Sequence, residues 1–458
     1  MRNNETNKVL FVSLGCDKNL VDSEEMLGAL QQRGFVFTDD EEEADAAIVN
    51  TCCFIMDAQK ESIDQILALA QRRTEGQLKA LIVTGCMAQR YKDEVLREIP
   101  EVDAVIGTTA QDRIAPTLEE IIGTAKEAGR DGRLFVADQN LRTGTTAERI
   151  VTTGGYYSYL KIAEGCDKKC TYCAIPGIRG SYRSVPMEAL IKEANQLASD
   201  GVKELVVVAQ ETTVYGLDIY GEKRLHILLR ELCKIDGIEW IRILYCYPEE
   251  IYDQLIETIS SEKKICHYLD IPIQHSDDTI LQRMGRRTNN EYLRNLIGKL
   301  RKAVPDIVLR TTLITGFPGE TEENFENLKS FVKEMRFDRL GAFAYSAEEG
   351  TVAAGMDGQI PDDIKEHRRD EIMLIQQEIA FEKADEKVGM TVPVIIEGRL
   401  DDGALVGRTY MDAPDVDGYV FIDSDKDLMS GTIMNVRITG SNEYDLIGEV
   451  LSVEEEIL

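Results

Sequence analysis

The sequence predicts an α/β protein made of three consecutive domains: an N-terminal doubly wound parallel-sheet domain, a central partial (β/α)6 barrel and a small C-terminal antiparallel β-barrel. Changes of pattern along the chain support this division. Short apolar runs alternate with amphipathic stretches up to about residue 125 and again from Tyr156 to about Phe381, whereas segments of period two follow Ala384. A length of 458 residues also exceeds what one hydrophobic core usually supports.

The first domain is expected over residues 8–125. Its apolar runs have the length of buried parallel strands, and the stretches between them have helical spacing, so the alternation predicts a doubly wound sheet. The expected strands are Val9–Leu14, Ala46–Val49, Leu81–Val83 and Val102–Ile106, and the expected helices are Ser23–Gln32, Ala58–Arg72 and Asp112–Ile122. Residues 126–154, rich in Gly, Thr and charge, are expected to form a connector.

The second domain is expected over residues 155–383. Its six β/α repeats are too few to close an eight-fold barrel, so the pattern predicts an open, partial barrel. The expected strands are Tyr159–Ile162, Glu204–Val208, Trp240–Leu244, Tyr268–Ile271, Val308–Ile314 and Arg339–Phe343.

The third domain is expected over residues 384–456, as a barrel of about five short strands separated by Asp- and Gly-rich turns. From Glu386 to the end the chain carries 16 acidic and 5 basic residues, which argues against an oligonucleotide-binding role for this barrel. Four of its strands are expected at Val392–Ile396, Leu405–Arg408, Gly418–Ile422 and Ile433–Thr439.

Composition narrows the classes of function. The net charge of −30 opposes sequence-independent attachment to a phosphate backbone and favours a basic partner, although solubility alone can account for acidity and a local basic patch can still hold RNA. No apolar run is long enough to cross a bilayer and the opening residues lack the apolar core of a secretion signal, so no membrane contact and a cytoplasmic location are expected. Ten cysteines in such a protein indicate metal binding or catalysis rather than disulfides.

Cys166, Cys170 and Cys173 follow the first expected strand of the central barrel, at the strand end where ligands gather in α/β folds. Three thiolates in this spacing suit an iron–sulfur cluster, and the lack of a fourth cysteine nearby in the sequence would leave one iron open to a substrate or cofactor. A zinc site or a loop of reduced thiols is the alternative, but zinc usually takes four ligands in Cys-x2-Cys pairs.

Cys16, Cys52 and Cys86 each follow a different expected strand of the first domain. Because parallel strands bring their carboxyl ends to one edge of a sheet, the three thiols are expected to converge in a second site. Gly15 and Gly85, directly before two of them, would let the backbone and a cluster approach closely. The alternative is that these cysteines are small apolar core residues.

The spacing Cys-x3-Cys-x2-Cys at residues 166–173 resembles the signature of the radical S-adenosylmethionine superfamily. The runs Ser-Leu-Gly-Cys-Asp-Lys-Asn-Leu-Val-Asp-Ser-Glu, Val-Asn-Thr-Cys and Val-Thr-Gly-Cys-Met-Ala-Gln-Arg resemble the N-terminal domain of the methylthiotransferases, whose domain order also ends in a TRAM barrel. The likeness covers nearly the whole chain. It implies a transferase with S-adenosyl-L-methionine and two [4Fe-4S] clusters: a radical cluster on Cys166, Cys170 and Cys173, and an auxiliary cluster on Cys16, Cys52 and Cys86.

By the same resemblance, one S-adenosylmethionine methylates a sulfur held on the auxiliary cluster, and a second is reduced to an adenosyl radical that removes hydrogen from the substrate carbon. The electron would come from a low-potential donor such as flavodoxin or ferredoxin. The scheme requires no protein acid or base, so no catalytic residue is assigned beyond the cluster ligands. Cys53 departs from the family, which commonly has Gly there, and register favours Cys52 as the ligand.

Weaker signals around the barrel suggest contacts with the cofactor. Tyr172 precedes the third cysteine, where the superfamily often places an aromatic ring against adenine, and Gly316 lies in the run Thr315–Thr321 that resembles a loop near the adenosyl group. Gln210, Gln274 and Arg310 lie at or near expected strand ends. For each of them an ordinary packing, turn or hydrogen-bonding role is the alternative.

The family has one branch that modifies an adenosine in transfer RNA and another that modifies the β-carbon of an aspartate in the twelfth small-subunit ribosomal protein. Gly-Cys-Asp-Lys-Asn-Leu-Val-Asp-Ser-Glu and Ala-Gln-Glu-Thr-Thr-Val-Tyr-Gly resemble the protein-modifying branch. The acidic terminal barrel also suits a basic ribosomal protein better than RNA, so nucleic acid is not expected to be the direct substrate. Transfer RNA modification and a non-catalytic metal-storage or scaffold protein remain the alternatives.

Overall fold

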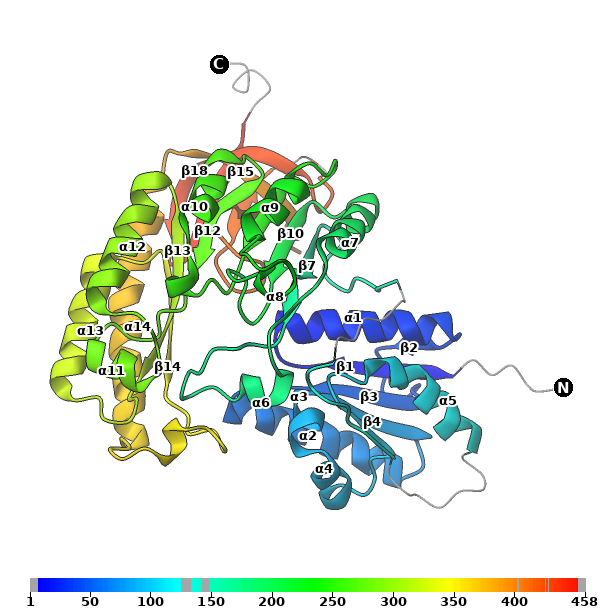
Figure 1. The fold of residues 1–458 in the computed structure, drawn as a ribbon. Coiled ribbons are helices and arrows are strands. Elements are labelled where there is room, and N and C mark those ends of the chain that lie inside the picture. Colours follow the sequence, from blue (N-terminus) through cyan, green and yellow to red (C-terminus); the bar gives the residue numbers. More distant parts are fainter. Residues whose placement is uncertain are drawn as a thin grey trace. The chain divides into compact units, whose positions relative to one another are not determined.

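The computed structural model describes residues 7–124, 133–141, 148–401, 403–424, 426 and 428–451. The chain divides into two compact units, each of which is built from separate stretches of sequence (Figure 1). The first comprises Met1–Thr152, Glu164–Arg183 and Ser346–Ala354, and the second comprises Thr153–Ala163, Ser184–Tyr345 and Gly355–Leu458. The segment with Cys166, Cys170 and Cys173 therefore belongs to the N-terminal unit, although it lies in the middle of the chain.

The first unit is built on a parallel sheet with the strand order β2-β1-β3-β4-β5-β6. Its elements are β1 (Lys8–Ser13), α1 (Asp17–Gln32), β2 (Val36–Thr38), β3 (Ala46–Thr51), α2 (Met56–Thr74), β4 (Ala80–Gly85), α3 (Cys86–Tyr91), α4 (Asp93–Glu98), β5 (Ala104–Ile106), a 3-10 turn (Gln111–Arg113), α5 (Ile114–Thr124) and β6 (Arg133–Phe135).

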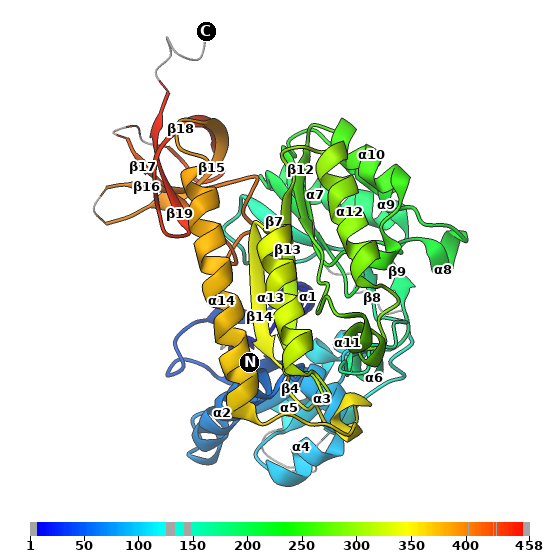
Figure 2. The same cartoon turned by 90° about the vertical axis from the view of Figure 1, so that its left-hand side faces the viewer.

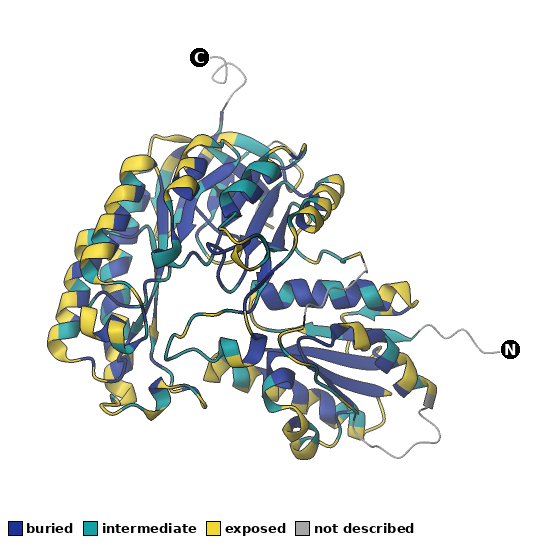
Figure 3. Cartoon of the chain, in the orientation of Figure 1, coloured by how far each residue is buried: buried dark blue, intermediate teal, exposed yellow. Residues whose placement is uncertain are grey.

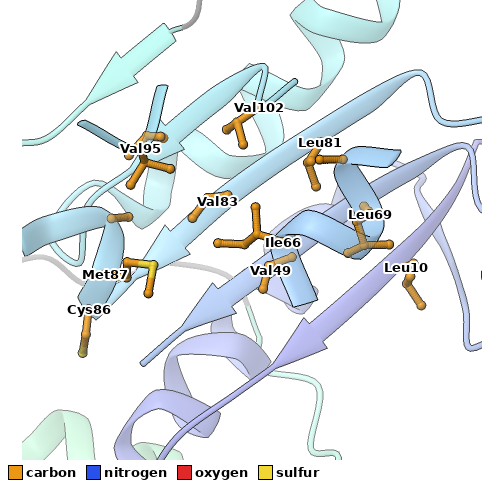
Figure 4. Packing of buried hydrophobic residues seen from close by; sticks show 14 of the residues in the cluster. Leu10, Val49, Ile66, Leu69, Leu81, Val83, Cys86, Met87, Val95 and Val102 are labelled. Atoms are coloured by element: carbon orange, nitrogen blue, oxygen red, sulfur yellow. The ribbon is translucent and has the colours of Figure 1, made fainter. Parts of the chain in front are cut away.

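Both faces of this sheet are covered by helices, because alternate residues of each buried strand point to opposite sides. On one face Ile48 and Ile82 pack with residues of α1 and α5. On the other, Val49 and Val83 pack with Ile66 of α2, as Figure 4 shows. The predicted doubly wound sheet is confirmed, with α-helical layers on both sides.

β6 is a departure from the expected pattern, since it lies inside the range 126–154 where a connector was predicted. Ala104, Val105 and Ile106 of β5 pair in parallel with Arg133, Leu134 and Phe135. A segment with two apolar residues is too short to show a hydrophobic period. It is a strand because it pairs with the free edge of β5. The elements β2, α3 and α4 were not predicted, because they too are short.

The second unit contains a parallel sheet with the strand order β14-β13-β12-β11-β10-β7 (Figures 1 and 2). β7 and β14 form its two edges, so the barrel is open, as predicted. The strands are β7 (Tyr157–Lys161), β10 (Glu204–Val208), β11 (Trp240–Ile243), β12 (Ile265–Asp270), β13 (Val308–Thr315) and β14 (Arg339–Ala344). The chain passes between the units through β8 (Ala163–Glu164), α6 (Ile175–Arg179) and β9 (Arg183–Ser184).

Helices follow the strands of this barrel, and their outer faces are exposed while the strands are buried (Figure 3). No helix among the described residues is long and apolar enough to span a bilayer. The helices are α7 (Met187–Ser199), α8 (Leu217–Tyr220), α9 (Leu225–Cys233), α10 (Asp253–Ser261), α11 (Asp278–Arg283), α12 (Asn290–Ala303), α13 (Glu322–Met335) and α14 (Asp362–Asp385), with 3-10 turns at Pro248–Glu250 and Ala353–Gly355.

A small closed barrel ends the second unit, with the strand order β15-β16-β17-β19-β18. It confirms the predicted fold of the third domain, except that β17 and β19 pair in parallel. The chain leaves β17, forms β18 first, and returns through the β18–β19 hairpin to lie beside β17. The strands are β15 (Thr391–Arg399), β16 (Leu405–Thr409), β17 (Val420–Asp423), β18 (Ile433–Asn442) and β19 (Asp445–Val450).

Within the second unit, a buried ionic network joins the terminal barrel to the parallel sheet. Glu204 accepts a hydrogen bond of 2.7 Å from Nε of Arg242 and lies 2.6 Å from Nη2 of Arg408. Arg408 also donates to Glu397 over 2.9 Å. Burial raises the pKa of Glu204, but the two guanidinium groups outweigh it and hold that pKa below its usual value.

A second set of contacts comes from the acidic loop of residues 410–417. Asp412 forms an ion pair with Arg339. Tyr268 donates to Asp417 over 2.7 Å, and Tyr157 donates to Asp415 over 2.5 Å. These carboxylates are therefore paired inside the second unit, and the terminal barrel is held to the parallel sheet by charge as well as by packing.

Replacing Arg408 with Met should destabilise the second unit, because Glu397 loses its cation and Glu204 keeps only one. Breaking a buried pair costs about 3–5 kcal/mol. Unfolding in urea can be followed by the fluorescence of Trp240, the single tryptophan of the chain, which lies in β11. The matched control is Arg437→Met, which removes an exposed pair with Glu449 and should cost less than about 1 kcal/mol. Equal midpoints for the two variants would contradict this role of Arg408.

Candidate functional site

Three neighbouring parallel strands bring Cys16, Cys52 and Cys86 to the same edge of the first sheet. Cys16 precedes α1, Cys52 directly follows β3, and Cys86 begins α3 directly after β4. In the strand register, Asn50 is opposite both Ser13 of β1 and Thr84 of β4. The strands thus end level with one another, and residues 36 and 34 positions apart in sequence meet in space.

The glycines before two of these cysteines allow the close approach. Gly15 has φ +96°, and a Cβ there would lie 2.8 Å from Cβ of Cys52 and 3.0 Å from its sulfur. Gly85 has φ +90°, and a Cβ there would lie 2.3 Å from Oδ1 of Asn50 and 2.6 Å from the carbonyl oxygen of Thr51. A side chain at either position would therefore collide with the neighbouring strand end.

The chemistry of this donor set fits an iron–sulfur cluster. Cys16 is exposed, whereas Cys52 and Cys86 are buried. Burial raises the pKa of the Cys86 thiol to about 12 and also raises that of Cys52, so loading a metal group would have to displace their protons. Soft thiolates on a buried edge that opens toward solvent at Cys16 are the ligands that iron–sulfur clusters take.

No three His, Cys, Asp or Glu side chains in the part of the chain that the structure describes are placed to hold a single metal ion. A single zinc ion, with Zn–S bonds of about 2.3 Å, holds its sulfurs about 3.8 Å apart. A cubane differs because each cysteine binds a different iron, so its ligands stand farther apart.

Cys53 lies beside this site as an additional thiol. It is fully buried in the hydrophobic cluster that also contains Cys86 and Val83. Arg90 donates to its carbonyl oxygen over 3.0 Å, and burial raises the pKa of its thiol to about 11. Cys52, not Cys53, supplies the atoms that lie nearest to a Cβ built at Gly15.

Arg179, at the end of α6, is a residue of this site that the sequence analysis missed. Its side chain is only 2% exposed, and both Nε and Nη2 lie 3.3 Å from the sulfur of Cys86. Burial lowers the pKa of the Arg179 guanidinium, but the nearby Cys86, Glu164 and Asp22 outweigh this effect and raise that pKa well above its usual value. One signal was present: a lone basic residue in the run Ile-Pro-Gly-Ile-Arg-Gly, shortly after Cys173.

The other three cysteines lie on a tight segment of the same unit. The N–H of Cys173 donates to the carbonyl oxygen of Cys170 over 3.1 Å, and the N–H of Cys166 donates to that of Gly180 over 3.0 Å. The N–H of Lys168 points at the sulfur of Cys166 over 3.5 Å. Burial raises the pKa of Cys173 to about 12, so this set would also lose protons on loading.

This segment packs on the core of the first unit. Ile178 is buried in the cluster that contains Cys86 and Met87, and Ala174, next to Cys173, packs against the same cluster. Figure 4 shows Cys86 and Met87, the first two residues of α3, at one end of this cluster. Cys86 of the first set and the segment that follows Cys173 of the second therefore pack into one hydrophobic core.

The weaker candidates are distributed over both units. Tyr172 lies in the first unit with the cysteines, and Gln210 lies two residues after the end of β10 in the second. Gln274 has φ +69°, rare for a residue with a side chain, and its N–H donates to the carbonyl oxygen of Thr312 over 2.8 Å. Gly316 has φ +70°, and a Cβ there would lie 2.3 Å from Cγ of Lys365.

Arg310 has structural partners within the second unit. Its guanidinium lies 3.2 Å from Asp270 and 3.8 Å from Asp417 of the terminal barrel. These two carboxylates balance the charge of Arg310. Its presence at this position can therefore be explained without the cofactor contact that the sequence suggested.

Three parts of the chain match known families. Residues 8–107 match the uncharacterized protein family UPF0004, residues 160–332 match the radical SAM superfamily, and residues 388–451 match the TRAM domain. These matches follow the order expected from the sequence motifs.

Solved structures share the fold at low identity. The radical S-adenosylmethionine methyltransferase TsrM from Kitasatospora setae, solved with cobalamin and a [4Fe-4S] cluster bound, has a TM-score of 0.53 and 14% identity, over 74% of this chain and 75% of that one. The cobalamin-dependent S-adenosylmethionine radical enzyme OxsB has a TM-score of 0.54 and 12% identity, over 81% of this chain and 56% of that one.

Curated relatives are much more similar. The ribosomal protein uS12 methylthiotransferase RimO of Lachnoclostridium phytofermentans is 61% identical over 96% of this chain and 99% of its own length. Its namesakes from Acetivibrio thermocellus and Clostridioides difficile are 50% and 48% identical, each over 97% of this chain and at least 98% of their own lengths. The chain therefore belongs to the RimO family of methylthiotransferases, which are radical SAM enzymes.

Proposed function

We propose that this chain adds a methylthio group to the β-carbon of an aspartate in the ribosomal protein uS12. The observation that carries the proposal is the pair of three-cysteine sets within one compact unit of a chain from the RimO family. The proposed ligands are Cys166, Cys170 and Cys173 for a radical [4Fe-4S] cluster, and Cys16, Cys52 and Cys86 for an auxiliary one.

The family uses S-adenosylmethionine and [4Fe-4S] clusters, which when bound supply the radical, the electron path and the transferred sulfur. Three protein ligands for each cluster leave one iron for S-adenosylmethionine or for sulfur. Gly15 and Gly85 keep side chains away from the auxiliary site, and the backbone turn between Cys170 and Cys173 holds two ligands of the radical site together. Tyr172, Gln210, Gln274, Arg310 and Gly316 are proposed as cofactor contacts.

The proposed partner is basic, and exposed acidic residues of the terminal barrel suit it. Asp401, Asp423 and Glu443 are exposed there, whereas Asp412 and Asp417 are committed to Arg339 and Tyr268 inside the unit. Attraction of a basic protein, and repulsion of RNA, would therefore rest on the exposed residues only. A low-potential donor such as flavodoxin or ferredoxin would supply the electrons, in the reducing cytoplasm where thiols stay free.

The choice between protein and RNA can be tested directly. The anaerobically reconstituted chain, incubated with S-adenosylmethionine, a reductant and either uS12 or transfer RNA, should add a methylthio group to one aspartate of uS12 only, as read by mass spectrometry. The double variant Cys170→Ala, Cys173→Ala should form no product while retaining the auxiliary cluster. A methylthio group on transfer RNA alone would overturn the proposed substrate.

The ligand assignment at the auxiliary site can be tested with adjacent cysteines. Cys52→Ala should lose about one cluster per chain, because three thiolates are needed to hold it, whereas Cys53→Ala should retain both. Iron and acid-labile sulfide contents measure the difference. The reverse result, with loss on Cys53→Ala alone, would move the ligand to Cys53.

The role of the glycine before Cys86 can be tested against a second glycine of the same unit. Gly85→Ala should lose the auxiliary cluster, because the new Cβ would collide with Asn50 and Thr51. Gly76→Ala is the matched control, since Gly76 also has positive φ, +78°, but faces open space. It should cost only the backbone strain, about 1 kcal/mol, and keep both clusters. Equal iron contents in the two variants would contradict the steric account.

A further inference from the structure

Arg179 is a buried charged side chain of the first unit that several hydrogen bonds hold beside Cys86. Nη1 donates to Asp22 over 2.6 Å and lies 3.2 Å from Glu164, and Nη2 donates to Asn19 over 3.0 Å. Asn19 and Asp22 lie on α1 and Glu164 lies on β8, so two elements hold the Nη1 and Nη2 atoms of the guanidinium.

These contacts orient the remaining N–H groups of Arg179 toward the sulfur of Cys86. Nε and Nη2 both lie 3.3 Å from the sulfur of Cys86, a bidentate arrangement on one ligand atom. Asp22 is 1% exposed and Arg179 is 2% exposed, so water competes little for these hydrogen bonds.

We propose that Arg179 is a positioning residue that raises the reduction potential of the auxiliary cluster by donating two hydrogen bonds to the sulfur of Cys86. The inference rests on Cys86 being a ligand of that cluster, as proposed above. Hydrogen bonds to ligand sulfur stabilise the more negative, reduced cluster, and such outer contacts tune potential and orient the ligand.

We attribute the rise in reduction potential to the two directed N–H groups rather than to the positive charge of Arg179. The carboxylates of Asp22 and Glu164 already offset that charge. A cation without the planar guanidinium would therefore not reproduce the contact with Cys86. Lysine can keep an ion pair with the carboxylates but lacks the planar fork that reaches Cys86 with two N–H groups. The two substitutions to lysine and glutamine therefore separate charge from hydrogen bonding.

The test uses the full chain with Cys166, Cys170 and Cys173 replaced by Ala, so that only the auxiliary cluster is present. Its potential is measured by electron paramagnetic resonance during a redox titration. In Arg179→Gln the ratio of reduced to oxidised cluster at a fixed potential should fall about tenfold, equivalent to 59 mV for a one-electron couple. In Arg179→Lys the ratio should fall by a comparable factor, because the positive charge is kept but the two N–H contacts with Cys86 are lost.

The control is Arg73→Gln, which removes a partly buried arginine of the same unit that forms two 2.9 Å bonds with Asp103. It should leave the potential unchanged. Full iron content with an unchanged potential in both Arg179 variants would overturn the inference. A parent protein without iron would instead overturn the ligand assignment.

If neither Arg179 variant retains the cluster, the parent protein labelled with 15N-arginine decides the question. Electron–nuclear double resonance of its reduced cluster should show coupling to a guanidinium nitrogen. The absence of that coupling would overturn the inference, because no arginine N–H would then contact the cluster.

Discussion

The parallel pairing of β1, β3 and β4 is the constraint on which the rest of the site depends. Parallel strands in one sheet must end at a common edge, and here the register ends them level with one another. Three cysteines far apart in sequence therefore meet without any long-range signal in the chain. Gly85 then matters because the strand ends are close, and Arg179 matters because Cys86 stands at this edge.

The core of the first unit explains how two cysteine sets from separate parts of the sequence belong together. Ala174 and Ile178, which follow Cys173, pack into the same cluster as Cys86. A chemistry in which a radical and a sulfur donor serve one substrate needs two centres held in a defined arrangement. Here that arrangement would rest on ordinary hydrophobic burial rather than on a flexible linker.

Charge in the terminal barrel has two separate roles. Its acidic composition suggests attraction of a basic partner, yet Asp412, Asp417 and Glu397 are paired with cations or tyrosine within the second unit. A net charge counted from sequence therefore overstates the charge that a partner would meet. Only the exposed carboxylates act at a distance, and salt in solution screens them.

The sequence by itself determined the longer strands of both parallel sheets and the terminal barrel, because apolar runs are local signals, and cysteine spacing picked out the six proposed cluster ligands. Tertiary structure alone decided β6, whose Arg-Leu-Phe has no period of its own, and the parallel β17–β19 pair. It also gave Arg310 its carboxylate partners and brought Arg179 to Cys86. These features depend on contacts between residues far apart in the chain, and such contacts leave no pattern in the residues around them.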